Sequence, residues 1–98
     1  MDKDAVITKP REHEPELKAA GIVHLRLHGS LARGTATATS DVDLIADFDA
    51  SKPPSLLDMV GLENRLSDLL GASVDLSPAH TLKPPVAQRV AQEAVLAF

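Results

Sequence analysis

The sequence predicts a small α/β (α+β) domain, in which a mixed sheet of at least three strands is covered by helices mainly on one face. Segments in which apolar residues recur at every second position, as in strands, are followed along the chain by segments in which they recur with helical spacing. The apolar content is 44%, and two Phe are the only aromatic residues, so the core must be aliphatic. A chain of 98 residues builds one domain with one modest core. We expect residues 1–12 to be a loosely ordered lead-in to this domain.

The first predicted elements are a helix, a strand and a short helical turn. Prolines and charged residues predict a helix over residues 14–20 that ends at Gly21. Residues 22–28 (IVHLRLH) alternate as a half-buried strand does. The apolar side chains predicted to face the core from this strand are Val23, Leu25 and Leu27. Residues 29–39 are rich in Gly, Ser, Thr and Ala, which predicts a short helical turn followed by a loop.

Two strands and two helices are predicted in the rest of the chain. Residues 42–48 alternate as a second strand, and residues 73–77 form a short third strand. A helix is predicted over residues 56–70, with Ser55 as its N-cap. A last amphipathic helix is predicted over residues 86–97. The residues predicted to face the core are Val42, Leu44, Ala46 and Phe48 in the second strand, Met59, Leu62, Leu66 and Leu69 in the long helix, and Val74 and Leu76 in the third strand.

Composition excludes several functional classes. The sequence has no cysteine, so it can form neither a disulfide nor a thiolate metal site. The formal net charge of −4 argues against a long DNA or RNA partner, because phosphate backbones are bound by basic surfaces. No segment has the roughly 20 apolar residues needed to span a bilayer, so we expect a soluble, cytoplasmic protein without a membrane partner.

Three carboxylates carry the predicted chemistry. Asp41 and Asp43 are two residues apart at the start of the second strand, so their side chains leave the same face, about 6–7 Å apart at Cα. Asp75 lies between two core residues of the third strand, so its side chain also points away from the core. If the second and third strands are neighbours, the three carboxylates converge on one open face. Such a set suits Mg²⁺, and two ions of this kind support phosphoryl transfer.

A glycine-serine pair precedes the carboxylates. Gly29 and Ser30 follow a strand and open a helical turn, where backbone N–H groups and the hydroxyl can approach a phosphate. The spacing to Gly34 is like that of a P-loop, but no GxxxxGK[ST] motif is present. The pair therefore predicts a phosphate site of another kind.

These residues resemble a known family. Gly29-Ser30, ten intervening residues and Asp41-x-Asp43 are similar to the GS-x10-DxD motif of the DNA polymerase beta-like nucleotidyltransferase superfamily. The fuller strings GS-x-ARG and SD-x-DL resemble its minimal nucleotidyltransferase branch, the antitoxin partners of HEPN toxins. The resemblance covers about residues 22–98 and implies the fold of that superfamily, and we expect residues 1–98 to be a single domain. One departure is His28, since family members usually carry a bulky apolar residue before the GS pair.

The resemblance also implies roles for the site residues. Gly29 and Ser30 would hold the triphosphate, and Asp41 and Asp43 would ligate both metal ions. Asp75 would ligate the catalytic metal and favour deprotonation of the acceptor hydroxyl. Members of the branch transfer AMP from ATP to a tyrosine of the partner toxin, which implies a hetero-oligomer, ATP as substrate and two Mg²⁺ ions.

Several residues have an ordinary alternative. Arg33 either contacts the nucleotide phosphates or pairs with an acidic residue to brace the loop. Ser40 is expected to cap or hydrogen-bond the loop. His24 and His28 share a strand face with Arg26, but no third ligand is evident in the sequence, so we expect solvated or partner-facing residues there.

Three functions are compatible with this pattern. The first is an AMP-transferring enzyme that acts on a protein hydroxyl, with an acceptor in another molecule because the 98 residues contain no Tyr. The second is a non-catalytic antitoxin that neutralises its partner by binding alone. The third is a nucleotidyltransferase that acts on a small molecule, although 98 residues leave little room for an acceptor pocket.

Overall fold

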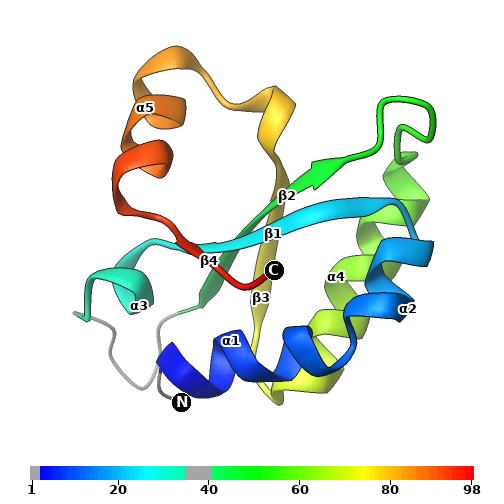
Figure 1. Cartoon of the computed structure of the whole chain (residues 1–98), viewed down its shortest axis with the longest axis horizontal. Coiled ribbons are helices and arrows are strands. Elements are labelled where there is room, and N and C mark those ends of the chain that lie inside the picture. Colours follow the sequence, from blue (N-terminus) through cyan, green and yellow to red (C-terminus); the bar gives the residue numbers. More distant parts are fainter. Residues whose placement is uncertain (1–2, 35–40) are drawn as a thin grey trace.

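The computed structural model describes residues 3–34 and 41–98 and contains a four-stranded mixed sheet in the order β3-β2-β1-β4 (Figure 1). Strand β1 (Ile22–His28) pairs in antiparallel fashion with β2 (Val42–Phe48) and with β4 (Val95–Leu96). Strand β3 (Val74–Pro78) runs parallel to β2. The predicted mixed sheet with helices is therefore confirmed. No helix in the described part of the chain is long and apolar enough to cross a membrane.

Three helices cover one face of this sheet. Helices α1 (Lys3–Glu12), α2 (Glu14–Ala19) and α4 (Leu56–Leu70) pack together and against the strands (Figure 1). Between them and the sheet lies an aliphatic core, as the composition predicts. Its buried residues are Val6, Ile7, Leu17, Ile22, Leu25, Leu27, Leu31, Val42, Leu44, Ala46, Leu62, Leu66, Leu70, Val74, Leu76 and Ala97.

The long helix α4 has the predicted bounds because a capping box begins it and a glycine in the left-handed conformation ends it. The Ser55 hydroxyl accepts from the backbone N–H of Asp58, and the Asp58 carboxylate accepts from the N–H of Ser55. This reciprocal capping box satisfies backbone donors that the first turn leaves without helical partners. At the other end Gly71 adopts φ 65°, a left-handed conformation that suits glycine.

The expectation of a loosely ordered lead-in is wrong. Residues 3–12 form α1, which packs on α4 and buries Val6 and Ile7 to 1% and 8% exposure. The Arg11 Nε also donates to the carbonyl of Ala97, 2.7 Å away. Tertiary packing stabilises this helix although its own sequence, with Pro10 inside it, has weak helical propensity.

The predicted alternation along β1 fails at its first residues. The pairing register with β2 shifts between Ile22 and His24, so Val23 is an additional residue in an irregular pair. Val23 is consequently 41% exposed, and Ile22 takes the core position at 1% exposure. A β-bulge of this kind reverses the facing of the residues before it.

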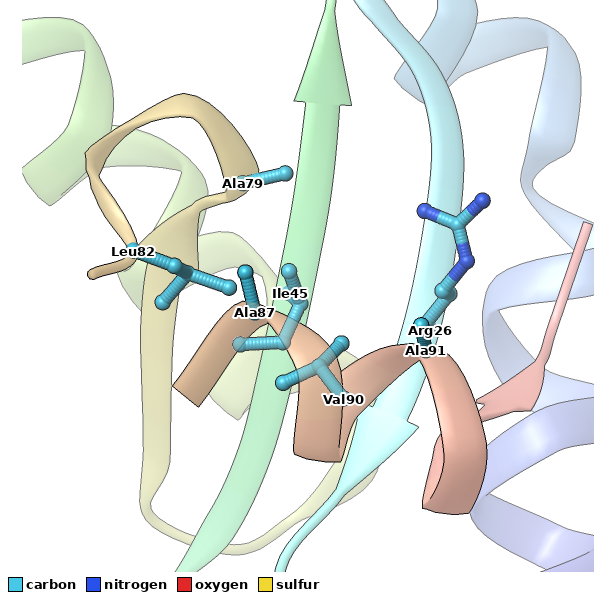
Figure 2. A pocket seen from close by; sticks show the side chains of 7 residues that line it. All are labelled: Arg26, Ile45, Ala79, Leu82, Ala87, Val90 and Ala91. Atoms are coloured by element: carbon cyan, nitrogen blue, oxygen red, sulfur yellow. The ribbon is translucent and has the colours of Figure 1, made fainter. Parts of the chain in front are cut away.

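The last helix is shorter than predicted. Helix α5 (Pro84–Glu93) ends because Ala94 has ψ 145°, and the chain then forms β4 beside β1. The N–H of Ala97 donates to the carbonyl of Leu25 at 2.8 Å, so the chain end satisfies an otherwise open edge of β1. Helix α5 lies apart from the other helices (Figure 1) and covers Ile45, which points away from the main core (Figure 2). The second face of the sheet is therefore partly covered.

Candidate active site

The second face of the sheet carries a row of three polar residues from adjacent strands. His28 of β1 is paired with Asp43 of β2, and Asp43 is paired with Asp75 of β3. Residues that are paired across strands project to the same face. We call Asp43 and Asp75 the carboxylate row, and His28 lies beside it. The parallel β2–β3 pairing, which the sequence left open, thus brings Asp43 and Asp75 side by side.

Asp43 lies in an environment that disfavours its charge. Partial burial is the main cause that raises the pKa of Asp43, and the neighbouring carboxylate of Asp75 raises it further. Asp41 adds a smaller effect in the same direction, whereas His28 and Arg33 oppose it. The carboxylates therefore repel one another, and a cation bound between them would relieve that repulsion.

The turn before the short helix α3 (Ser30–Arg33) is built against Asp43. Gly29, the N-cap residue of α3, has φ 81°. A Cβ at this position would lie 2.2 Å from Asp43 Oδ2 and 3.2 Å from Asp43 Cβ. Only glycine therefore permits both the backbone conformation and the close approach of this turn to the carboxylate. Ser30 is the first residue of the helix.

A cluster of charged residues joins α3 to the end of α5. The Arg33 guanidinium lies 3.5 Å from Glu93 Oε2, and His28 Nε2 lies 3.8 Å from the same oxygen. His28 Nε2 is buried and has no hydrogen-bond partner among the described residues. The structure thus shows the bracing contact for Arg33, and it makes His28 a partly buried residue beside the carboxylates instead of a solvated one. Sequence reasoning did not identify Glu93, which is 60 positions from Arg33 and has no motif around it.

The predicted site residues are not all brought together to the same degree. Asp43 and Asp75 are neighbours, and Asp41 is an exposed residue directly before β2. Among residues 3–34 and 41–98, no three His, Cys, Asp or Glu side chains are arranged to hold a metal ion. Ser40 and the rest of residues 35–40 lie outside the described residues.

The donor set nevertheless fits a hard divalent cation such as Mg²⁺. Asp43 and Asp75 supply carboxylate oxygens from paired positions. Partial burial and, after it, the neighbouring Asp75 carboxylate raise the pKa of Asp43, so its negative charge is poorly compensated in the protein alone. Phosphate oxygens of a nucleotide would supply further ligands, as is usual for Mg²⁺ in proteins. The fit rests on oxygen chemistry and charge, and the protein alone provides only part of the coordination shell.

Comparison with known proteins identifies the family. The model of the nucleotidyltransferase domain family matches residues 10–97. Protein adenylyltransferase MntA of Thermococcus cleftensis is 40% identical over 84 residues, which cover 85% of this chain and 83% of the relative. A solved structure provisionally named a minimal nucleotidyltransferase has a TM-score of 0.78 and 36% identity, and the match covers 97% of this chain and 95% of that one.

A fourth match shows the fold alone. In a complex of a tri-AMPylated Shewanella oneidensis HEPN toxin with an MNT antitoxin, one chain matches with a TM-score of 0.68 and 15% identity. This match covers 93% of the present chain and 70% of that one. The family that the GS and DxD motifs resemble is confirmed by the nucleotidyltransferase domain match and by the relatives at 40% and 36% identity. The chain belongs to the nucleotidyltransferase family of enzymes, within its branch of minimal nucleotidyltransferases.

Proposed function

We propose that this chain transfers AMP from ATP to a tyrosine hydroxyl of a partner HEPN toxin and thereby neutralises it. The observation that carries the proposal is the pairing of Asp43 with Asp75 next to the tightly packed turn at Gly29. The name of the Thermococcus cleftensis relative and the AMPylated toxin in the Shewanella oneidensis complex support this choice of reaction. Because the 98 residues contain no Tyr, an acceptor tyrosine belongs to another molecule.

The reaction assigns a task to each residue. Gly29 and Ser30 bind the triphosphate, with the N–H groups of the turn as donors. Asp41, Asp43 and Asp75 would hold two Mg²⁺ ions, which would neutralise the charge of the reacting phosphates. Asp75 also favours loss of the acceptor proton, which passes to water. The acceptor oxygen bonds to the α-phosphorus, the bond between this phosphorus and the bridging oxygen breaks, and pyrophosphate leaves. We propose that the reaction takes place in the cytoplasm, where ATP is available as the donor.

The test is transfer of radiolabel from α-labelled ATP to the co-purified partner. Asp43→Ala and Asp41→Ala should each abolish labelling, whereas Asp68→Ala, an exposed change on α4, should preserve it. Circular dichroism of each variant confirms that the fold is retained. Undiminished labelling with either site variant would overturn the proposal. Mass spectrometry of the labelled partner identifies the acceptor residue and counts the transfers.

Neutralisation by contact alone is the second candidate, and one observation favours it. Helix α4 exposes Leu56, Leu57 and Val60 to 81%, 83% and 49%, which is apolar surface that a partner could cover. Protection of cells from the toxin by a double Asp41→Ala/Asp43→Ala variant would favour this function. Loss of protection together with loss of labelling would favour the enzyme.

A further inference from the structure

Strand β3, which carries Asp75, lies at the edge of the sheet. Among the described residues its one strand neighbour is β2 (Figure 1). The N–H of Val42 donates to the carbonyl of Ser73 at 2.9 Å, so residue 73 is directed at β2. Because the direction of the backbone groups alternates along a strand, the N–H groups of Val74 and Leu76 are directed at the open edge. These two residues flank Asp75.

Side chains of α4 bind both of these edge groups. The N–H of Leu76 donates to Glu63 Oε2 at 3.0 Å, and the N–H of Val74 donates to Ser67 Oγ at 3.2 Å. Glu63 and Ser67 are four residues apart, which is an advance of about 6 Å along a helix. Val74 and Leu76 are two residues apart, which is about 6–7 Å along a strand. One turn of α4 therefore matches the two donors on either side of Asp75.

We propose that Glu63 and Ser67 are positioning residues for AMP transfer, because they anchor β3 on both sides of Asp75 and keep its carboxylate beside Asp43. The inference rests on the proposed function, since it takes Asp75 as a ligand of the reacting centre. Both residues act through the backbone of β3, so neither is itself a catalytic residue.

Repulsion between the carboxylates acts on a strand with few backbone partners. Partial burial and, after it, the charge of Asp75 raise the pKa of Asp43, so the two paired carboxylates repel each other. Strand β3 has five residues and pairs in parallel with β2, and parallel pairs are slightly less stable per residue than antiparallel ones. Helix α4 is packed on the core, so bonds from α4 fix β3 relative to the rest of the domain.

The core alone restricts β3 less precisely than the chemistry requires. Val74 and Leu76 are buried, which opposes a slip of one residue, because that slip would bring Asp75 into the core. Aliphatic contacts are non-directional, however, so they permit smaller shifts of an edge strand. Catalytic groups need placement within about 0.5 Å, and an error of about 1 Å can lower a rate about 100-fold. Directional hydrogen bonds supply the additional restriction.

The competing interpretation is that the two bonds only protect an open edge. Edge donors that are left free can pair with a strand of another molecule, and bonded donors cannot. Pro78, the next residue directed at the edge, has no N–H, so the protection is complete within β3. Edge protection predicts an unchanged rate of AMP transfer, whereas positioning predicts a lower kcat.

The test compares variants that remove an acceptor with variants that retain one. Glu63→Ala and Ser67→Ala should each lower the kcat of AMP transfer by about ten-fold. The KM for ATP should stay within about two-fold, because in the proposed function Gly29 and Ser30 bind the triphosphate. Glu63→Gln and Ser67→Thr keep an oxygen acceptor and should restore kcat to within about three-fold. Asn64→Ala, an exposed change on the same helix, should alter neither constant.

Three further measurements separate positioning from a loss of stability. Amide hydrogen exchange of Leu76 should become faster by about ten-fold or more in Glu63→Ala and stay slow in Glu63→Gln. Val6→Ala, a core change on α1, should lower the free energy of unfolding without lowering the kcat of the folded protein. Mg²⁺ titration, followed through the amide resonances of Asp43 and Asp75, should give an affinity about ten-fold weaker in Glu63→Ala than in the wild type.

The outcomes are distinct. Unchanged kcat in Glu63→Ala, together with faster exchange at Leu76, assigns the bonds to edge protection alone and overturns the inference, while the proposed function stands. Equal losses of kcat in Glu63→Ala and Val6→Ala assign the effect to stability and also overturn the inference. A wild type that transfers no AMP contradicts the proposed function. In that case weaker Mg²⁺ binding by Glu63→Ala supports the inference, and unchanged Mg²⁺ binding overturns it.

Discussion

Gly29 and Asp43 are packed so tightly that a methyl group on Gly29 would lie 2.2 Å from Oδ2 of Asp43. The glycine of one motif and the second aspartate of the other are therefore fitted to each other in space, although 13 residues separate them. This contact fixes the turn that opens α3 directly beside the carboxylate row. It also means that the two motifs cannot be varied independently.

Replacement of Gly29 by alanine should abolish AMP transfer and destabilise the fold. Gly34→Ala is the matched control, because Gly34 also has a positive φ, 76°, but no described atom lies within 4 Å of the place that its methyl group would take. Both changes incur backbone strain of about 1–3 kcal/mol, but only Gly29→Ala adds the collision with Asp43. Gly29→Ala should therefore have a lower free energy of unfolding in urea than Gly34→Ala, and it should transfer less label. Equal effects would show that the contact is unimportant.

Asp43→Asn should stabilise the metal-free protein at neutral pH. Because the folded pKa of Asp43 is raised, its favourable contribution is present below the unfolded value of 3.8 and is lost as pH rises through the folded pKa. The Tm difference between Asp43→Asn and the wild type should therefore grow between about pH 3 and pH 7 in chelator. Added Mg²⁺ should raise the Tm of the wild type and not that of the variant. A difference independent of pH would contradict this account.

Glu93→Gln should tighten the binding of ATP. The Glu93 carboxylate lies 3.5 Å from Arg33 and 3.8 Å from His28, so it competes with phosphate for the positive charge at the turn. Since partly exposed ion pairs contribute up to about 1 kcal/mol, the gain in affinity should reach about five-fold and shrink with added salt. Glu12→Gln, at the exposed end of α1, removes the same charge elsewhere and should have no effect. Weaker binding by Glu93→Gln would show that this carboxylate supports the site instead of competing.

Leu66→Ala should destabilise the domain by about 2–5 kcal/mol, the usual cost of such a change in a core. Leu66 is fully buried on the inner side of α4, whereas Leu57 on the same helix is 83% exposed. Leu57→Ala should accordingly change the free energy of unfolding by less than about 0.5 kcal/mol. Chemical denaturation of both variants measures the difference. Similar losses of unfolding free energy in the two variants would mean that α4 packs on the core through another face.

The sequence by itself determined the local structure. The alternation of residues 22–28 and 42–48 places two strands, and Ser55, Asp58 and Gly71 fix both ends of α4. These features depend on side chains that are close in sequence, because helical and extended backbones have different periods and capping is a contact over three residues. The pattern of Gly29-Ser30 with Asp41 and Asp43 likewise indicated the chemistry.

The tertiary structure alone decided which of these pieces meet. Helix α1 was expected to be loosely ordered and is held by its packing on α4, and residues 94–97 leave the predicted helix because β1 offers an open edge. The pairing of Asp43 with Asp75 and the approach of Glu93 to His28 both join residues far apart in sequence. Periodicity specifies the face of an element but not its neighbour, because strand order and register depend on the packing of the whole core.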